Sequence, residues 1–111
     1  MCYSNYAFTK DPGSKKGALP PIRAKASPHL VFTELNNYFK TNNYNEFASR
    51  EEFYDLFFKI DNFEISLNIL PDENKSLICL SVYSEKKSLK TKKTLYRIYE
   101  LVEKILERYR W

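Results

Sequence analysis

The chain has 111 residues, of which 43% are hydrophobic and 16% aromatic, enough for a single domain with one modest core. Its two glycines, Gly13 and Gly17, both lie near the N-terminus, which excludes a glycine-rich phosphate-binding loop after them. The net charge of +4 is unevenly distributed: residues 31–85 carry four cations and ten acids, whereas residues 86–111 carry nine cations and three acids. Such asymmetry is typical of proteins that meet a charged partner, although the basic ends also neutralise the middle of the chain.

The cysteines Cys2 and Cys79 and the single histidine show no metal-binding spacing, so we expect neither a metal site nor a cofactor. We interpret both cysteines as reduced thiols. No apolar stretch reaches transmembrane length, and no apolar segment of a signal peptide follows the first residues. The sequence therefore predicts a cytoplasmic protein without a membrane partner.

Residues 1–27 show no sustained hydrophobic periodicity and contain both glycines together with Pro12, Pro20 and Pro21. Residues 1–30 carry five cations and one acid. We expect a flexible basic arm over residues 1–27 and one small domain over residues 28–111.

The first helix is predicted to begin at Ser27 as N-cap, with Pro28 at the first helical position. Val31, Leu35 and Phe39 recur at helical spacing and give this helix an apolar face. The polar run 41–43 is predicted to end it.

Residues 49–60 fit a helix and a strand about equally well. Ser49 and Glu52 match a capping box, which favours a helix. If Asp61 and Asn62 form a two-residue hairpin turn, however, the apolar residues before and after the turn lie opposite one another on one face. The predicted pairs are Ile60/Phe63, Phe58/Ile65, Leu56/Leu67 and Tyr54/Ile69, with Lys59 opposite Glu64 on the other face. We therefore prefer a strand over residues 53–60.

A six-residue loop over 71–76 extends the same register, because it places Ile69, Leu67 and Ile65 opposite Ile78, Leu80 and Val82. The predicted strands are 53–60, 63–70 and 77–84, and a last helix runs from about residue 88 to 110. The sheet face away from the apolar residues carries Asp55, Phe57, Lys59, Glu64, Ser66, Asn68, Cys79, Ser81 and Tyr83. The predicted fold is an α+β, two-layer α-β-β-β-α sandwich, in which two helices cover one face of a three-stranded antiparallel meander.

No residue pattern points to catalysis. His29 has no serine, cysteine or aspartate at a triad-like spacing, and we interpret it as a surface residue at a helix start. The acidic pair Glu51 and Glu52 suits helix capping or solubility better than acid–base chemistry. Cys79 has no basic neighbour in the predicted sheet that would lower its pKa. We therefore expect a non-enzyme without catalytic residues.

A lysine-rich run precedes and opens the predicted last helix. Lys86, Lys87, Lys90 and Lys93 recur at spacings that would line one side of a helix start. Lysines at a helix N-terminus oppose the helix dipole, so we infer that they serve a partner rather than the fold, the alternative being a solvated helix start. The predicted nucleic-acid-binding residues are Lys86, Lys87, Lys90, Lys92, Lys93 and Arg97.

The predicted element order and the run 86–90 resemble the double-stranded-RNA-binding domain, which begins its last helix with a KKxAK-like run. The resemblance implies that Lys86, Lys87 and Lys90 contact phosphates. The chain departs from that family at its second contact region, where Asp61 and Asn62 replace a Gly-Pro-x-His loop. We expect non-enzymatic binding to nucleic-acid backbone, RNA included, through the helix start and the basic arm.

The alternative is a protein-interaction module: an adaptor, a chaperone-like protein or an inhibitor of a larger machine. Apolar residues at 3,4 spacing in the last helix could pair with a second copy in a homodimer. They are Leu95, Ile98, Val102, Ile105 and Tyr109. The predicted edge strands 54–60 and 77–84 could also recruit a partner strand. Phe57 and Tyr83 on the open sheet face offer base stacking, but Asp55 and Glu64 on that face repel phosphates.

Overall fold

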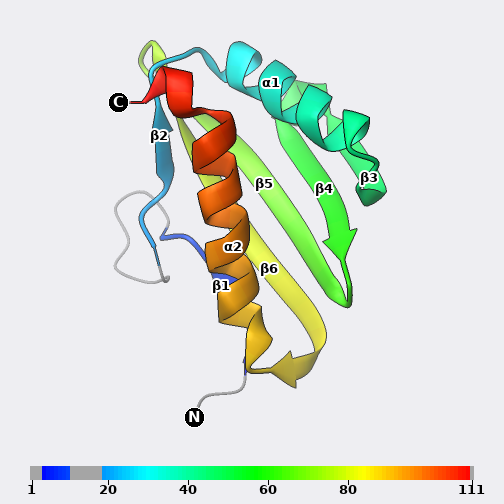
Figure 1. The fold of residues 1–111 in the computed structure, drawn as a ribbon. Helices are drawn as coiled ribbons and strands as arrows, with labels where there is room; N and C mark the ends of the chain where they lie inside the picture. The colour runs from blue at the N-terminus through cyan, green and yellow to red at the C-terminus, as the bar shows by residue number, and fades with distance from the viewer. Residues whose placement is uncertain (1–3, 11–18, 111) are drawn as a thin grey trace.

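The computed structural model describes residues 4–10 and 19–110, in which two helices cover one face of a six-stranded antiparallel sheet (Figure 1). The strands are β1 (Ser4–Phe8), β2 (Ile22–Ala24), β3 (Asn45–Arg50), β4 (Asp55–Ile60), β5 (Phe63–Asp72) and β6 (Lys75–Ser88). The helices are α1 (Pro28–Thr41) and α2 (Lys90–Ile105), with short 3₁₀ turns η1 (Glu51–Phe53) and η2 (Glu107–Tyr109). The predicted α+β class is confirmed.

The sheet is wider than the predicted three-stranded meander. Its strand order is β1-β6-β5-β4-β3, and β2 also pairs with β6. The predicted meander corresponds to β4, β5 and β6. However, β3 pairs along the outer edge of β4, and β1 and β2 pair along the outer edge of β6. The segments 54–60 and 77–84 are therefore interior, and the prediction that they form exposed edges is wrong.

The predicted register of the central strands is confirmed. β4 and β5 pair Ile60 with Phe63, Phe58 with Ile65, Leu56 with Leu67 and Lys59 with Glu64. Asp61 in the connecting turn has a φ of 54°, the left-handed conformation that a two-residue hairpin turn requires. β5 and β6 pair Ile69 with Ile78, Leu67 with Leu80 and Ile65 with Val82.

The six-residue loop predicted over 71–76 is wrong, because pairing continues as far as Asp72 and Lys75. Glu73 and Asn74 form the turn, and Glu73 has a φ of 59°. The register survives this error because the two strands lengthen by equal numbers of residues.

Residues 49–60 divide into three parts, which resolves the choice between helix and strand. Residues 55–60 form β4, as predicted, whereas Tyr54 has a left-handed φ of 53° and lies outside the strand. Ser49 belongs to β3 and Glu52 to η1, so these two residues do not form the capping box of a helix. Tyr54 still meets its predicted neighbour, because its carbonyl accepts a hydrogen bond of 3.1 Å from the Ile69 amide.

Helix α1 begins as predicted. The Ser27 side chain accepts a 3.3 Å hydrogen bond from the Leu30 amide, and Pro28 occupies the first turn. Its buried face carries Val31, Phe32, Leu35 and Phe39.

Helix α2 packs its apolar stripe into the core of its own chain. Leu95, Ile98 and Val102 are at most 2% exposed, and Ile105 and Tyr109 pack against the same core. Most of the predicted seam for a second helix is therefore packed within the chain. Within residues 4–10 and 19–110, no helix combines the length and apolar character needed to span a membrane.

Two strands lie within residues 1–27, which the sequence predicts to be an arm. β1 and β2 bury Ala7, Ile22 and Ala24 at the margin of the core, which favours their pairing with β6. Cys2 and residues 11–18, including the cations Lys15 and Lys16, lie outside the described residues.

Candidate nucleic-acid interface

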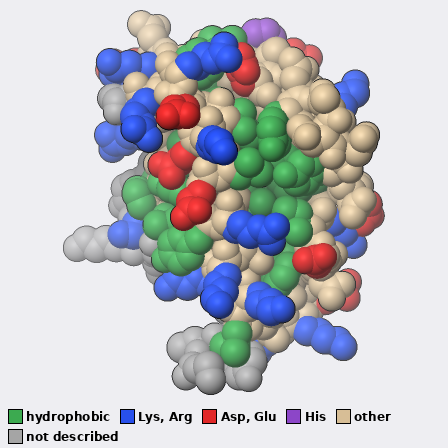
Figure 2. All heavy atoms as spheres, in the orientation of Figure 1, with side chains coloured by type: hydrophobic (Ala, Val, Ile, Leu, Met, Phe, Trp, Pro, Cys, Tyr) green, Lys and Arg blue, Asp and Glu red, His purple; other side chains and the backbone are tan. Residues whose placement is uncertain are grey.

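The six predicted basic residues are divided between a strand and a helix. Lys86 and Lys87 lie near the end of β6, Lys90 is the first residue of α2, and the others follow in α2. All six side chains are exposed. We call this set the basic surface: Lys86, Lys87, Lys90, Lys92, Lys93 and Arg97. Figure 2 shows lysine and arginine side chains gathered over the beginning of α2.

The prediction that Lys86 and Lys87 belong to a helix start is wrong. β6 continues to Ser88 because β1 pairs along it, with Ser4 opposite Ser88. The Asn5 side-chain amide also donates to the carbonyls of Ser84 and Glu85. The register between β1 and β6 shifts between Tyr6 and Ser4, opposite residues 84–87, so Lys86 and Lys87 lie in an irregular part of the strand.

A stripe of cations remains on α2. Lys90, Lys93 and Arg97 stand at helical spacings of three and four, which places them on one side of the helix. The first turn of α2 contains no acid. Leu89 occupies the N-cap position, and its side chain makes no capping hydrogen bond to the backbone amides of that turn. The Ser88 hydroxyl instead accepts a 3.1 Å hydrogen bond from the Lys90 amide. The stripe spans about 10 Å at 1.5 Å per residue.

None of the ion pairs found among the described residues neutralises the basic surface. Those pairs join His29 to Glu51, Arg50 to Asp55 and Lys59 to Glu46. Lys92 contacts an aromatic ring instead, with its ammonium 5.8 Å from the centre of the Tyr96 ring. The charge of α2's first two turns is therefore presented to solvent.

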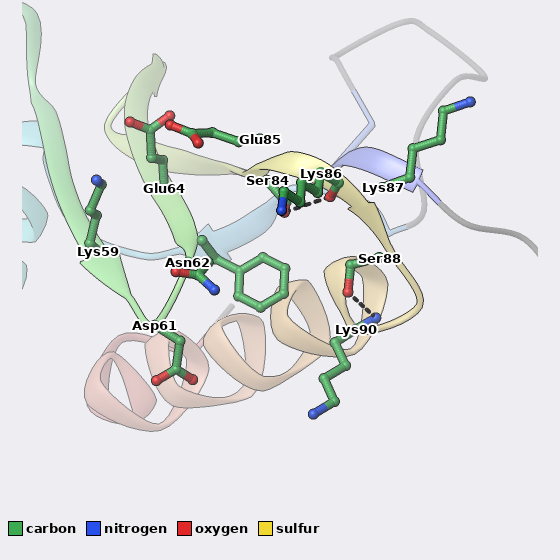
Figure 3. Close-up of a pocket in the computed structure, with 11 residues that line it drawn as sticks. Lys59, Asp61, Asn62, Glu64, Ser84, Glu85, Lys86, Lys87, Ser88 and Lys90 are labelled. Atoms are coloured by element: carbon green, nitrogen blue, oxygen red, sulfur yellow. Dashed lines mark hydrogen bonds between the residues drawn. The ribbon is translucent and has the colours of Figure 1, made fainter.

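A hollow of about 760 Å³ separates the β4–β5 turn from the junction of β6 and α2 (Figure 3). Its charged lining is mixed: Lys59, Lys86, Lys87 and Lys90 face Asp61, Glu64 and Glu85. Figure 3 shows the side chains of Lys87 and Lys90 extending in different directions. Because acids balance most of its cations, the hollow suits phosphate less well than the outward stripe on α2.

His29 and Cys79, two other residues weighed for chemistry in the sequence, lie on separate elements, α1 and β6. His29 Nδ1 lies 3.8 Å from Glu51 Oε1, and both side chains are about two-thirds exposed. Cys79 lies half-buried in β6, opposite Asn68 of β5. Within the described ranges, no three histidine, cysteine or acidic side chains are grouped closely enough to hold a metal ion.

The arrangement also differs from the one implied by the double-stranded-RNA-binding domain. The element order contains three additional strands, β1, β2 and β3, and two of the three lysines lie in a strand instead of a helix start. The comparisons of this chain with protein families, curated proteins and solved structures found no match.

Proposed function

We propose that the chain is a non-enzymatic, cytoplasmic protein that binds the phosphate backbone of nucleic acid through the basic surface. The observation that carries the proposal is the unneutralised stripe of Lys90, Lys93 and Arg97. These side chains are exposed, and no acid among the described residues pairs with them.

The physical case rests on the helix dipole. Cations in the first turn of a helix lie beside its positive end and cost stability. A bound phosphate chain offsets this cost, because it interacts favourably with the lysines and with the positive end of the helix. Backbone contacts of this kind carry no sequence information, so the proposed binding is non-specific in sequence.

Arg23 and Lys25, two cations of the predicted arm, lie away from Lys86 and Lys87. β2 pairs with residues 76–78 of β6, whereas Lys86 and Lys87 lie at the other end of that strand. Eight residues of extended chain separate Ile78 from Lys86, about 26 Å. Arg23 and Lys25 are therefore remote from Lys86 and Lys87, whereas Arg23 lines a hollow with Tyr99, which follows Arg97 by two residues.

The test is fluorescence anisotropy of labelled duplex and single-stranded RNA and DNA, titrated with the full chain over a salt series. Contact with three to six phosphates predicts that log K falls with log salt at a slope of about 3 to 5, because each duplex contact contributes about 0.9. Absence of binding at about 20–50 mM salt, where salt screens electrostatic attraction only weakly, would contradict the proposal.

One observation favours a second candidate function, protein–protein interaction: the sheet face away from the helices is uncovered by any helix of the described chain (Figure 1). This face carries aromatic, serine and acidic side chains, in contrast to the lysines and arginine of the basic surface.

A further inference from the structure

The sheet face opposite the helices contains a shallow trough. Two hollows of about 420 and 370 Å³ adjoin there and share Tyr6, Ser66 and Ser81 in their lining. Neither helix lies over this side of the sheet in Figure 1.

In one row of the sheet, small side chains occupy the central strands and large ones the flanking strands. Reading across the sheet, Phe57 of β4 lies opposite Ser66 of β5, Ser66 opposite Ser81 of β6, and Ser81 opposite Phe8 of β1. The two hydroxymethyl groups form a low floor between two phenyl rings.

The neighbouring row of the sheet combines charge with aromatic rings. Lys59 lies opposite Glu64, Glu64 opposite Tyr83, and Tyr83 opposite Tyr6. Tyr6 is 51% exposed and Tyr83 is 39% exposed, so both rings offer surface to a ligand. Their centroids lie 6.2 Å apart. The Tyr6 ring also meets the Phe8 ring edge-on at 5.5 Å, which continues the aromatic wall along β1.

Among the residues that line the trough, two carboxylates, Glu46 and Glu64, stand against one cation, Lys59. The Lys59 ammonium lies 3.2 Å from Glu46 Oε2. The hydrogen bond and charge of Glu46 raise the pKa of Lys59, and the more distant charges of Glu64 and Glu85 raise it further. Glu46 and Glu64 line the trough with Lys59, and Glu85 lines the adjoining hollow together with Glu64 and Lys86. Figure 3 shows the Glu64 and Glu85 side chains beside one another.

The chain already binds the guanidinium group of its own Arg50 between aromatic rings and a carboxylate. The Arg50 guanidinium carbon lies 5.0 Å from the centre of the Phe53 ring and 5.2 Å from that of Phe57, and the group pairs with the Asp55 carboxylate. Phe57 also lines the trough. Rings and carboxylates in this part of the sheet thus form a guanidinium site in the folded chain.

We propose that the trough binds an arginine side chain of a partner polypeptide, with the guanidinium against the rings of Tyr6 and Tyr83 and paired with Glu64 and Glu85. The charge of the trough complements a cation and repels phosphate. Arginine is favoured over lysine because its planar group stacks on aromatic rings and pairs with carboxylates through two hydrogen bonds. The stripe on α2 lies on the other side of the sheet (Figure 1), whereas Lys86, Lys87 and Lys90 line the same hollow as Glu64 and Glu85.

The test uses the ¹⁵N-labelled full chain and three labelled peptides in which serine alternates with arginine, lysine or citrulline, the neutral analogue of arginine. The arginine peptide is expected to bind most tightly and to shift the amide signals of Glu64, Ser66, Ser81 and Tyr83. The double variant Glu64→Gln/Glu85→Gln is expected to lose roughly tenfold in affinity, as loss of two partly exposed ion pairs predicts. Glu100→Gln/Glu103→Gln, an equal change of charge on exposed α2 positions, is the matched control and should bind as the unaltered chain does.

Three results would overturn the proposal. The first is equal affinity for the arginine and citrulline peptides, and the second is an equal loss of affinity in the two double variants. The third is a shift of the trough signals when the chain alone is concentrated without peptide, provided that Arg97→Glu abolishes the shift. This result would mean that the trough binds Arg97 of a second copy of the chain. Loss of the preference for arginine over lysine in Tyr83→Leu would support the stacking geometry. A failure of nucleic-acid binding leaves these expectations unchanged.

Discussion

Replacing Lys90, Lys93 and Arg97 together with glutamate is expected to weaken nucleic-acid binding by about 100-fold or more while the fold is retained. Loss of three charge pairs, each worth about 1 kcal/mol in water, gives a factor of about 100 before any repulsion is counted. The stability of the domain should not fall, because acids near the start of α2 interact favourably with the helix dipole. Anisotropy with a labelled duplex, together with urea denaturation, measures both effects.

The matched control is the triple variant Lys25→Glu/Lys104→Glu/Arg108→Glu, which changes the net charge equally at exposed positions away from the start of α2. It is expected to retain most of the affinity. Equal losses in the two triple variants would show that net charge, and not the stripe on α2, governs binding.

Replacing Phe39 with alanine is expected to produce the largest loss of stability among these variants, about 3–5 kcal/mol in the free energy of unfolding. Phe39 is fully buried beneath α1. Its ring stacks on Phe58 of β4 with centroids 4.5 Å apart and meets the Tyr44 ring edge-on at 4.9 Å. The substitution removes these contacts and leaves a cavity between the helix and the sheet. Urea denaturation followed by circular dichroism measures the change.

Leu30→Ala is the control for this prediction, since Leu30 is in the same helix but 39% exposed. Its cost should stay within about 0.5 kcal/mol. A loss below about 1 kcal/mol for Phe39→Ala would contradict the packing of α1 over β4.

The central strands could be predicted from the sequence because two independent signals agree there. Alternating apolar residues define the buried face of β4, β5 and β6, and Asp61 supplies the left-handed turn that fixes their register. The start of α1 was equally accessible, because Ser27 and Pro28 are a local capping signal.

The strands at the two sides of the sheet lack such signals. Five of the six residues of β3 are exposed, so it shows no alternation, and a left-handed Glu46 interrupts its pairing. β1 and β2 are short, and their partner β6 lies more than fifty residues away in the sequence. The extension of β6 through Lys87 depends on β1, which explains why the sequence favoured a helix there.

The exposure of the basic residues followed from their chemistry, and the structure confirms it for all six. Their arrangement did not follow, because it depends on where α2 begins. The sequence predicts Phe57, Ser66, Ser81 and Tyr83 on the open face but no trough, because the wall formed by Tyr6 and Phe8 requires β1.

The most direct test of the central claim is a nuclear magnetic resonance titration of the ¹⁵N-labelled chain with a short nucleic-acid duplex at low salt. Binding through the basic surface predicts that the largest amide shifts fall within residues 86–97 and disappear as salt is raised. Ser66 and Ser81, on the open sheet face, should be unaffected. Shifts confined to the sheet face, or no shifts at any duplex concentration, would contradict the proposed nucleic-acid interface.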